Sequence, residues 1–313
     1  MTRVVTVTLN PAVDITYDVP ELQVGGSVRI SGVRSRAGGK GVNVAAVVRA
    51  LGGDSVVVAP TTLTTPDPFR DGLDLLGLDH HLVPAVRAVR HTVAVVGADG
   101  ATTILLEPGS PVEGDAEPDV VAAVSAELRT ADALVISGSV APGLSPHLPA
   151  RLAAMAAGRG VPVIADVSGP ALRAVPETGA VLTPNHDEFT ELTGHHAETV
   201  RDVAALGRRV IEGGAAAVVV TLGSRGAVAV TRSGAWYAPA AAAVDGNPTG
   251  AGDAAAAALA LWLAHTAAPI SWADALADAV ATSAACVLRP VAGEIDLQAR
   301  ARWRDTIIVE DLT

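Results

Sequence analysis

Short apolar segments with the composition of buried strands alternate along this chain with segments that have the pattern of helices. This alternation is typical of parallel sheets, because each crossover helix returns the chain to the same edge of the sheet. We expect strands at residues 132–136, 161–165, 179–183 and 215–221, with helices near 116–128, 146–158, 187–193, 199–212, 251–265 and 271–288. The sequence therefore predicts an α/β fold in which a mostly parallel central sheet carries helices on both faces.

Residues 12–36 and 81–106 depart from this rhythm. Both stretches alternate polar and apolar residues and contain turn sequences, Gly25-Gly26 in the first and Asp99-Gly100 in the second. Such a pattern predicts short antiparallel strands. We expect them to form a small β-sheet lid over the active edge of the main sheet. The 313 residues contain no long linker, so residues 1–313 are expected to form one large domain that includes this lid.

The charge of the chain excludes some partners. There are 22 basic and 33 acidic residues, and the net charge of −11 would repel nucleic acid and anionic lipid over most of the surface. An anionic substrate must therefore be bound by a local cluster of cations. The single cysteine, Cys286, cannot form an internal disulfide and is expected to be a small buried apolar residue.

No segment predicts export or membrane insertion. Residues 1–9 have the pattern of a strand and lack the long apolar region and cleavage site of a signal peptide. The apolar stretch at residues 254–264 is well short of the roughly 20 residues that span a bilayer. We expect a cytoplasmic protein with no membrane partner.

The first segment with chemical meaning is Ala-Gly-Gly-Lys-Gly-Val-Asn-Val-Ala at residues 37–45. Glycines let a ligand approach the backbone, and the helix start behind them offers unpaired N–H groups to an anion. Lys40 adds a point charge and is the only lysine of the chain. The segment lacks the Gly-Lys-Ser/Thr element of a Walker A motif. A glycine turn that only caps a helix is the alternative interpretation.

The second segment is Asn-Pro-Thr-Gly-Ala-Gly-Asp at residues 247–253, followed by an apolar helical run. Small residues at a helix start form an anion hole that neutralises charge on a transferred phosphoryl group. Asp253 then lies in the first helical turn, where its carboxylate can accept a proton from a hydroxyl group. Two alternatives stay open: Asp253 only caps the helix, or residues 250–255 form a dinucleotide-binding turn. An acid inside such a turn would repel a pyrophosphate.

Together these segments resemble the pfkB, or ribokinase-like, family of carbohydrate kinases. The resemblance covers every position of the family's carboxy-terminal signature from residue 247 to 260, and the Gly-Gly-Lys-Gly-x-Asn element. Thr-Leu-Asn-Pro-Ala-x-Asp at residues 8–14 is similar to the branch that contains 1-phosphofructokinase and tagatose-6-phosphate kinase. The resemblance implies a three-layer ribokinase-like sandwich with a β-sheet lid. It also implies ATP-dependent phosphorylation of a sugar phosphate of the fructose 1-phosphate or tagatose 6-phosphate type.

The resemblance also implies roles for individual residues on the sugar side. Asp253 would be the general base, beside an anion hole formed by Gly250, Ala251 and Gly252. Sugar hydroxyls would contact residues near the first glycine segment, namely Asp14, Gly39, Lys40 and Asn43. An existing phosphate on the sugar would bind two arginines of the lid segments, Arg29 and Arg90, because guanidinium groups suit phosphate oxygens. Asp14 as an ordinary turn residue and either arginine as a surface residue remain alternatives.

On the nucleotide side, the resemblance implies that Asn185 and Glu188 organise Mg²⁺ through water, which suits an ion that prefers oxygen ligands. ATP would also contact a strand and loop that contain Thr221, Gly223 and Gly226. An acidic helix start is the alternative for Glu188.

The sequence departs from the family pattern at three places. Thr183 stands where the branch usually has lysine, residues 59–67 lack a Gly-x-x-Gly-x-Asp stretch, and Arg90-His91-Thr92 replaces Arg-x-Asn. A kinase for a non-phosphorylated sugar or a nucleoside therefore remains an alternative, as does a catalytically weak sensor of sugar phosphate or ATP. The exposed edge of the lid suggests a homodimer.

Overall fold

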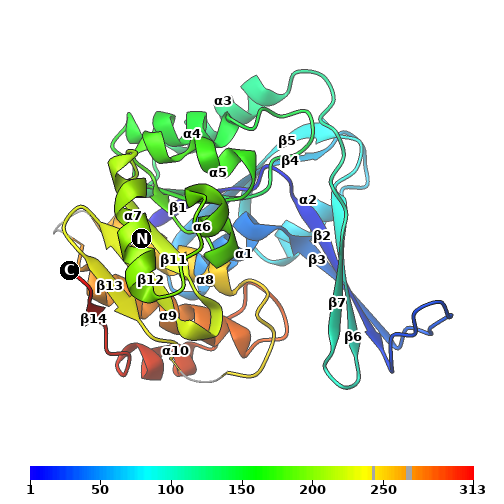
Figure 1. Ribbon diagram of the computed structural model, residues 1–313. Helices are drawn as coiled ribbons and strands as arrows, with labels where there is room; N and C mark the ends of the chain where they lie inside the picture. Colours follow the sequence, from blue (N-terminus) through cyan, green and yellow to red (C-terminus); the bar gives the residue numbers. More distant parts are fainter. Residues whose placement is uncertain (242–243, 266–269) are drawn as a thin grey trace.

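The central element of the computed structural model, which describes residues 1–241, 244–265 and 270–313, is a large twisted sheet (Figure 1). Neighbouring strands are parallel from β5 across to β11, and the strands beyond β11 are antiparallel. In spatial order the strands are β14 (Glu310–Asp311), β13 (Ala235–Ala238), β12 (Ala227–Thr231), β11 (Ala217–Thr221), β10 (Val181–Leu182), β9 (Val163–Val167), β8 (Ala133–Gly138), β1 (Arg3–Val7), β4 (Asp54–Thr62) and β5 (Asp79–Val86).

Both faces of this sheet are buried under helices. Along β1, Val5 and Val7 pack into one core while Val4 packs into the other, as the two-residue period of a strand requires. The first core lies under α3 (Glu117–Glu127), α4 (Leu148–Ala157), α5 (Pro170–Ala174), α6 (His186–Thr193) and α7 (Val200–Glu212). The second lies under α1 (Lys40–Ala50), α8 (Ala251–Ala264) and α9 (Trp272–Val287), with α10 (Leu297–Arg304) against α9. The predicted three-layer α/β architecture is confirmed.

The strands and helices expected between residues 116 and 288 are present within a few residues of their predicted bounds. Cys286 is buried as predicted, with 1% of its surface exposed. No helix in the described ranges is both long and apolar enough to cross a bilayer.

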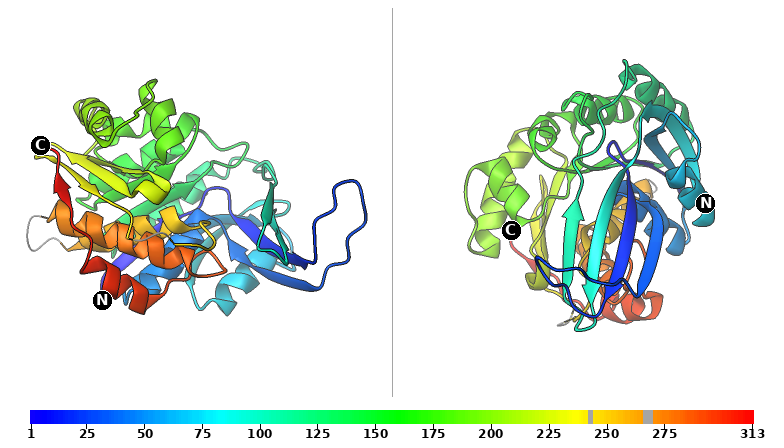
Figure 2. Two further views of the ribbon diagram at one scale, coloured as in Figure 1. Left: turned by 60° about the horizontal axis from the view of Figure 1, so that its bottom comes forward. Right: turned by 90° about the vertical axis from the view of Figure 1, so that its right-hand side faces the viewer.

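A second, smaller sheet projects from the main body (Figures 1 and 2). Its strands, in spatial order, are β3 (Gly32–Gly38), β2 (Ala12–Val19), β6 (Arg90–Gly97) and β7 (Thr102–Leu106). β2 starts soon after the carboxyl end of β1, and β3 leads directly into α1. The small sheet is therefore attached at the edge of the main sheet where the parallel strands end.

Two details of the expected small sheet were wrong. Residues 81–86 belong to β5 of the main sheet, because Val83 and Ala85 pack into its core, so the second stretch of the small sheet starts at Arg90. The pairing is also not purely antiparallel, since β2 and β6 run parallel to each other.

Candidate active site

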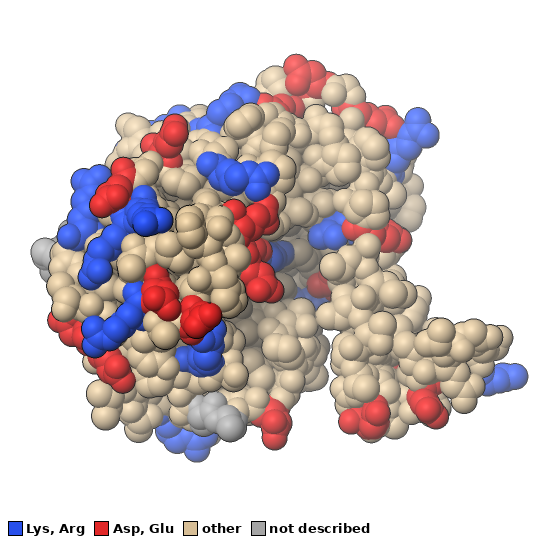
Figure 3. Space-filling view, viewed as in Figure 1, with Lys and Arg blue, Asp and Glu red and all other residues tan. Residues whose placement is uncertain are grey.

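A cavity of about 1140 Å³ opens between the main body and the small sheet, and Figure 3 shows this hollow with basic side chains inside it and acidic ones at its edge. Segments far apart in the sequence meet there, because parallel strands end at one edge of the sheet. Of the predicted site residues, those that line the cavity are Asp14, Gly39, Lys40, Asn43, Arg90, Asn185, Glu188, Thr221, Gly223, Gly226, Gly250, Ala251, Gly252 and Asp253.

Arg29 is the predicted site residue that the structure does not bring to this cavity. It is exposed on the loop between β2 and β3, which extends away from the body (Figure 1). Within one chain, Arg29 therefore does not lie beside Arg90. The atypical segment at residues 59–67 does not line the cavity either.

The start of α8 depends on the conformation of Gly250. This residue has φ of +84°, in the left-handed region that favours glycine, and a Cβ atom there would lie 2.8 Å from the Cβ of Ala292. At Gly252, in contrast, a Cβ atom would meet no atom within 4 Å. The first turn of a helix leaves N–H groups without partners in the helix, and here this turn lines the cavity. The N–H of Ala251 already donates to the carbonyl oxygen of Pro248 at 3.2 Å, so the N–H of Gly252 is the better placed of the two to bind an anion.

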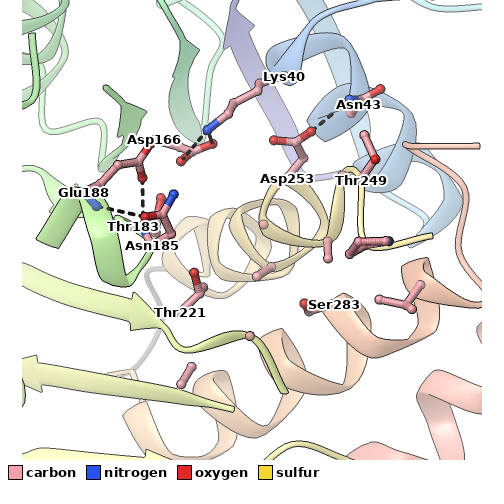
Figure 4. Close-up of a pocket in the computed structure, with 18 of the residues that line it drawn as sticks. Lys40, Asn43, Asp166, Thr183, Asn185, Glu188, Thr221, Thr249, Asp253 and Ser283 are labelled. Atoms are coloured by element: carbon pink, nitrogen blue, oxygen red, sulfur yellow. Dashed lines mark hydrogen bonds and ion pairs between the residues drawn. The ribbon is translucent and has the colours of Figure 1, made fainter. Parts of the chain in front are cut away.

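Asp253 follows this turn and is almost fully buried, with 4% of its surface exposed. Its Oδ2 accepts a hydrogen bond of 2.8 Å from Nδ2 of Asn43 in α1 (Figure 4). No side chain caps the start of α8, which argues against a purely capping role for Asp253. Burial, helped by the negative charge of Asp166, raises the pKa of Asp253 to about 7, although Lys40 and Asn43 act in the opposite direction. A carboxylate with this pKa is suited to exchange protons near neutral pH.

Lys40, which the sequence analysis assigned to the sugar side, forms an ion pair with Asp166 at the wall of the cavity. Its Nζ lies 3.2 Å from Oδ2 of Asp166, which also accepts a hydrogen bond of 3.0 Å from Oγ of Ser137. Burial lowers the pKa of Lys40, but the carboxylates of Asp166, Asp253 and Glu188 outweigh burial, so the pKa is raised. Lys40 therefore stays positively charged beside the carboxylates of Asp166, Asp253 and Glu188.

Asn185 and Glu188 form a capping box at the start of α6. Oδ1 of Asn185 accepts a bond of 2.9 Å from the N–H of Glu188, and Oε2 of Glu188 accepts one of 2.9 Å from the N–H of Asn185. Burial raises the pKa of Glu188, while the Asn185 N–H and Lys40 lower it. The second oxygen of Glu188 makes no hydrogen bond to another described residue and can face a ligand.

Asp14 and Arg90 form the sugar side of the cavity. Burial raises the pKa of Asp14, and this rise is limited by Arg36, by a hydrogen bond from Thr92 and by Arg90. Arg90 is itself held by backbone carbonyls: Nε donates to Asn10 at 3.3 Å and Nη1 donates to Glu107 at 2.9 Å. Its guanidinium group is thus fixed at the cavity wall beside a carboxylate.

Several residues that the sequence analysis did not assign also line the cavity. Asp166 had a usable signal, because it is an acid near the carboxyl end of an otherwise apolar strand sequence, and the structure buries it with 5% exposure. Thr183 contributes a buried hydroxyl group that has no hydrogen-bond partner among the described residues. The others with polar side chains include Thr8, Asn10, Thr92, Ser139 and Ser283.

The cavity thus combines a glycine-rich helix start with a buried carboxylate, an arrangement that suits phosphoryl transfer to an alcohol group. The sequence pattern that describes the pfkB family carbohydrate kinases matches residues 7–299. The chain belongs to the pfkB family of carbohydrate kinases. It is therefore an enzyme that transfers a phosphoryl group to an alcohol group, and ATP is the donor that membership of a kinase family implies.

Within this family, the chain is similar to several phosphofructokinases. The chain is 31% identical over 264 residues to a 1-phosphofructokinase of Xanthomonas campestris pv. campestris, which covers 82% of this chain and 83% of that protein. It is 28% identical to the ATP-dependent 6-phosphofructokinase isozyme 2 of Mycobacterium tuberculosis, over 84% of this chain and 78% of that one. Among solved structures, phosphofructokinase-2 of Escherichia coli superposes with a TM-score of 0.89 at 26% identity, covering 98% and 99% of the two chains. The ribokinase-like fold is confirmed.

The two glycines of the α8 turn should respond differently to alanine. Gly250→Ala places a side chain at a left-handed residue and against Ala292, and should lower the free energy of unfolding by at least about 1–2 kcal/mol. Gly252→Ala adds a methyl group in open space and should not lower the melting temperature, because alanine favours a helix. Gly252→Ala should instead weaken ATP binding. Thermal unfolding and calorimetric titration with ATP measure both effects, and equal melting temperatures would contradict this account of Gly250.

Proposed function

We propose that this kinase transfers the γ-phosphoryl group of ATP to a hydroxyl group of a sugar phosphate of the fructose 1-phosphate or tagatose 6-phosphate type. The observation that carries the proposal is the buried Asp253 carboxylate, which lies next to the α8 turn in the same cavity as Lys40, Asp14 and Arg90. The names of the relatives, which include a 1-phosphofructokinase, support the choice of substrate class.

In the proposed mechanism Asp253 accepts the proton of the attacking sugar hydroxyl. Asn43 holds its carboxylate in place, and the raised pKa makes the carboxylate a stronger base than an exposed aspartate. The N–H groups of the α8 turn and the ammonium group of Lys40 would stabilise the charge on the transferred phosphoryl group. Proton removal is expected to contribute about 10²- to 10⁴-fold to the rate, and positioning most of the remainder.

Magnesium is the cofactor that fits the acidic side of the cavity. The described residues include no cluster of three or more metal-ligating side chains, so the protein does not offer a complete cage. Mg²⁺ characteristically binds one or two carboxylates together with water and substrate phosphates. Asn185 and Glu188, with Asp166 nearby, supply oxygens of that kind, and the ion would neutralise charge on the ATP phosphates. Thr221, Gly223 and Gly226 would line the nucleotide side.

Recognition of the phosphate already present on the sugar is assigned to Arg90. Its guanidinium group is anchored by two carbonyl oxygens, yet Nη2 makes no hydrogen bond within the described part of the chain. Because Arg29 lies outside the cavity, a single arginine supports phosphate binding within one chain. This observation favours, as a second candidate, a kinase for a non-phosphorylated sugar.

Asp253→Asn tests the catalytic base. The variant should keep the fold and the affinity for ATP, and kcat should fall by about 10²- to 10⁴-fold. For the unmodified enzyme, kcat/KM should rise with pH and level off above about 7, because the raised pKa of Asp253 leaves it protonated and inactive below that value. A coupled assay of ADP release between pH 5.5 and 9 measures both.

The matched control is Asp274→Asn, which alters an exposed acid in the first turn of α9. It should leave both kcat and the pH profile unchanged. Near-normal turnover of Asp253→Asn would eliminate the assigned base.

Arg90→Leu separates the two candidate substrate classes. If a sugar phosphate is the substrate, its KM should rise by about 10- to 100-fold, because charged hydrogen bonds to the phosphate are lost. Arg87→Leu, at an exposed arginine that pairs with Glu113, is the control and should leave KM unchanged. The assay uses fructose 1-phosphate, fructose 6-phosphate and tagatose 6-phosphate alongside fructose and ribose. Preferential turnover of a neutral sugar, insensitive to Arg90→Leu, would support the second candidate.

We also propose that the small sheet forms a homodimer. Register places Val33, Tyr17 and Val95 in one row across β3, β2 and β6, and Leu105 of β7 lies on the same face, opposite to Leu106 at the cavity. Val33 and Leu105 are 62% and 57% exposed, an apolar surface that a partner would cover.

Sedimentation equilibrium should therefore give twice the mass of one chain. Replacing both Val33 and Leu105 by glutamate should give monomers that retain the melting temperature of the main body, since both side chains are exposed. A monomeric unmodified protein at micromolar concentration would refute the proposed dimer.

A further inference from the structure

Arg36 is a half-buried cation that lies near the active site without lining its cavity. It lies on β3 directly across from Asp14 on β2. Its Nη1 donates to the carbonyl oxygen of Ala292, and its Nε donates to that of Ala37 at 3.2 Å. Nη2 is shielded from solvent and has no hydrogen-bond partner among the described residues. The side chain thus joins the small sheet to the loop that follows α9.

Stability alone does not account for this arrangement. Burial of a guanidinium group is costly, and here burial lowers the pKa of Arg36 although Asp14 and Glu294 oppose that effect. A half-buried cation with one buried nitrogen that lacks a hydrogen-bond partner among the described residues is a weak stabilising element. Arg36 lies between Asp14 of the small sheet and the loop at residues 292–293, and a role in stability does not explain this position.

The loop that Arg36 holds is packed directly against the catalytic elements. The Cβ of Ala292 would be only 2.8 Å from a side chain on Gly250, so this loop supports the back of the α8 turn. A side chain on Gly293 would lie 3.2 Å from Nη2 of Arg36 and 3.2 Å from Oδ1 of Asn43. Residues 292–293 are therefore confined between Arg36, the α8 turn and Asn43, which in turn holds Asp253.

We propose that Arg36 is a positioning residue that holds the small sheet at a fixed position relative to the α8 turn. Asp14, on the sugar side, belongs to β2 of the small sheet, whereas Asp253 belongs to helix α8 of the main body. The contact from Arg36 to Ala292 connects the small sheet to the loop that packs against the start of α8. The same guanidinium group keeps a positive charge beside Asp14. This role rests on the kinase activity proposed above.

Two substitutions separate the tether from the charge. Arg36→Met removes both, so the KM for the sugar substrate should rise and kcat should fall by about 10²-fold, the loss that a displacement of about 1 Å can cause. Arg36→Lys keeps the charge near Asp14 but lacks the planar fork that reaches Ala292. It should keep KM within about threefold of the unmodified enzyme while kcat remains at least tenfold lower. The KM for ATP should be unchanged in both variants.

Arg34→Met is the matched control. Arg34 lies on the same strand and carries the same charge, but it is exposed and pairs with Asp18 instead of the loop at residues 292–293. Its kcat and KM should equal those of the unmodified enzyme. Hydrogen–deuterium exchange adds a readout that does not depend on activity: exchange at residues 290–294 and 250–254 should increase in Arg36→Met and not in Arg34→Met.

The outcomes distinguish this inference from the proposed function. An unmodified enzyme that phosphorylates none of the sugars tested would refute the proposed function, and the exchange measurement would still test the tether. Unchanged kcat, KM and exchange in Arg36→Met would overturn the inference. So would a lower melting temperature as the sole change, with kcat normal well below that temperature, since it would show a role limited to stability.

Discussion

The burial of one carboxylate, that of Asp253, is the constraint on which the rest of the site depends. A carboxylate removed from water needs compensation, and Asn43 and Lys40 supply it through a hydrogen bond and a nearby positive charge. The compensation is incomplete, so the pKa rises to about 7. In the proposed mechanism this imbalance suits the side chain to act as a base, because full stabilisation of the charged form would lower its proton affinity. The glycine turn in front of Asp253 then places peptide N–H groups where negative charge would develop.

The parallel sheet explains how such distant residues meet. Asn43 and Asp253 are separated by 210 positions in the sequence, and Lys40 and Asp166 by 126. Lys40 and Asn43 lie in the first turn of α1, Asp253 lies in the first turn of α8, and Asp166 lies near the carboxyl end of β9. These ends meet at the same edge of the sheet, so the topology brings the residues together. The small sheet, which projects from the main body (Figure 2), adds Asp14 and Arg90 to the lining of the same cavity. The cavity is thus formed by two structural units that must keep a fixed relation to each other.

The cavity contains a local positive charge although the protein as a whole is acidic. The chain carries a net charge of −11, and its sole lysine lies inside the cavity among three carboxylates. Those carboxylates keep Lys40 charged. In the proposed mechanism Lys40 would reduce the repulsion between them and an incoming phosphate. Thr183, at the position where lysine is expected from the family pattern, lines the same cavity. Lys40 therefore supplies the cationic charge on this side of the site.

The sequence alone determined the strand and helix order of the main sheet and the two glycine segments, because periodicity, helix starts and positive-φ positions such as Gly250 are local properties. Together with the family resemblance, these signals identified 14 residues that line the cavity, which are a minority of its lining. Only the tertiary structure decided that residues 81–86 join the main sheet, that Arg29 lies outside the cavity, and that Asp166 and Arg36 touch the catalytic segments. These facts depend on contacts between residues far apart in the chain. The strand propensity or the charge of a residue does not indicate which distant residue it will contact.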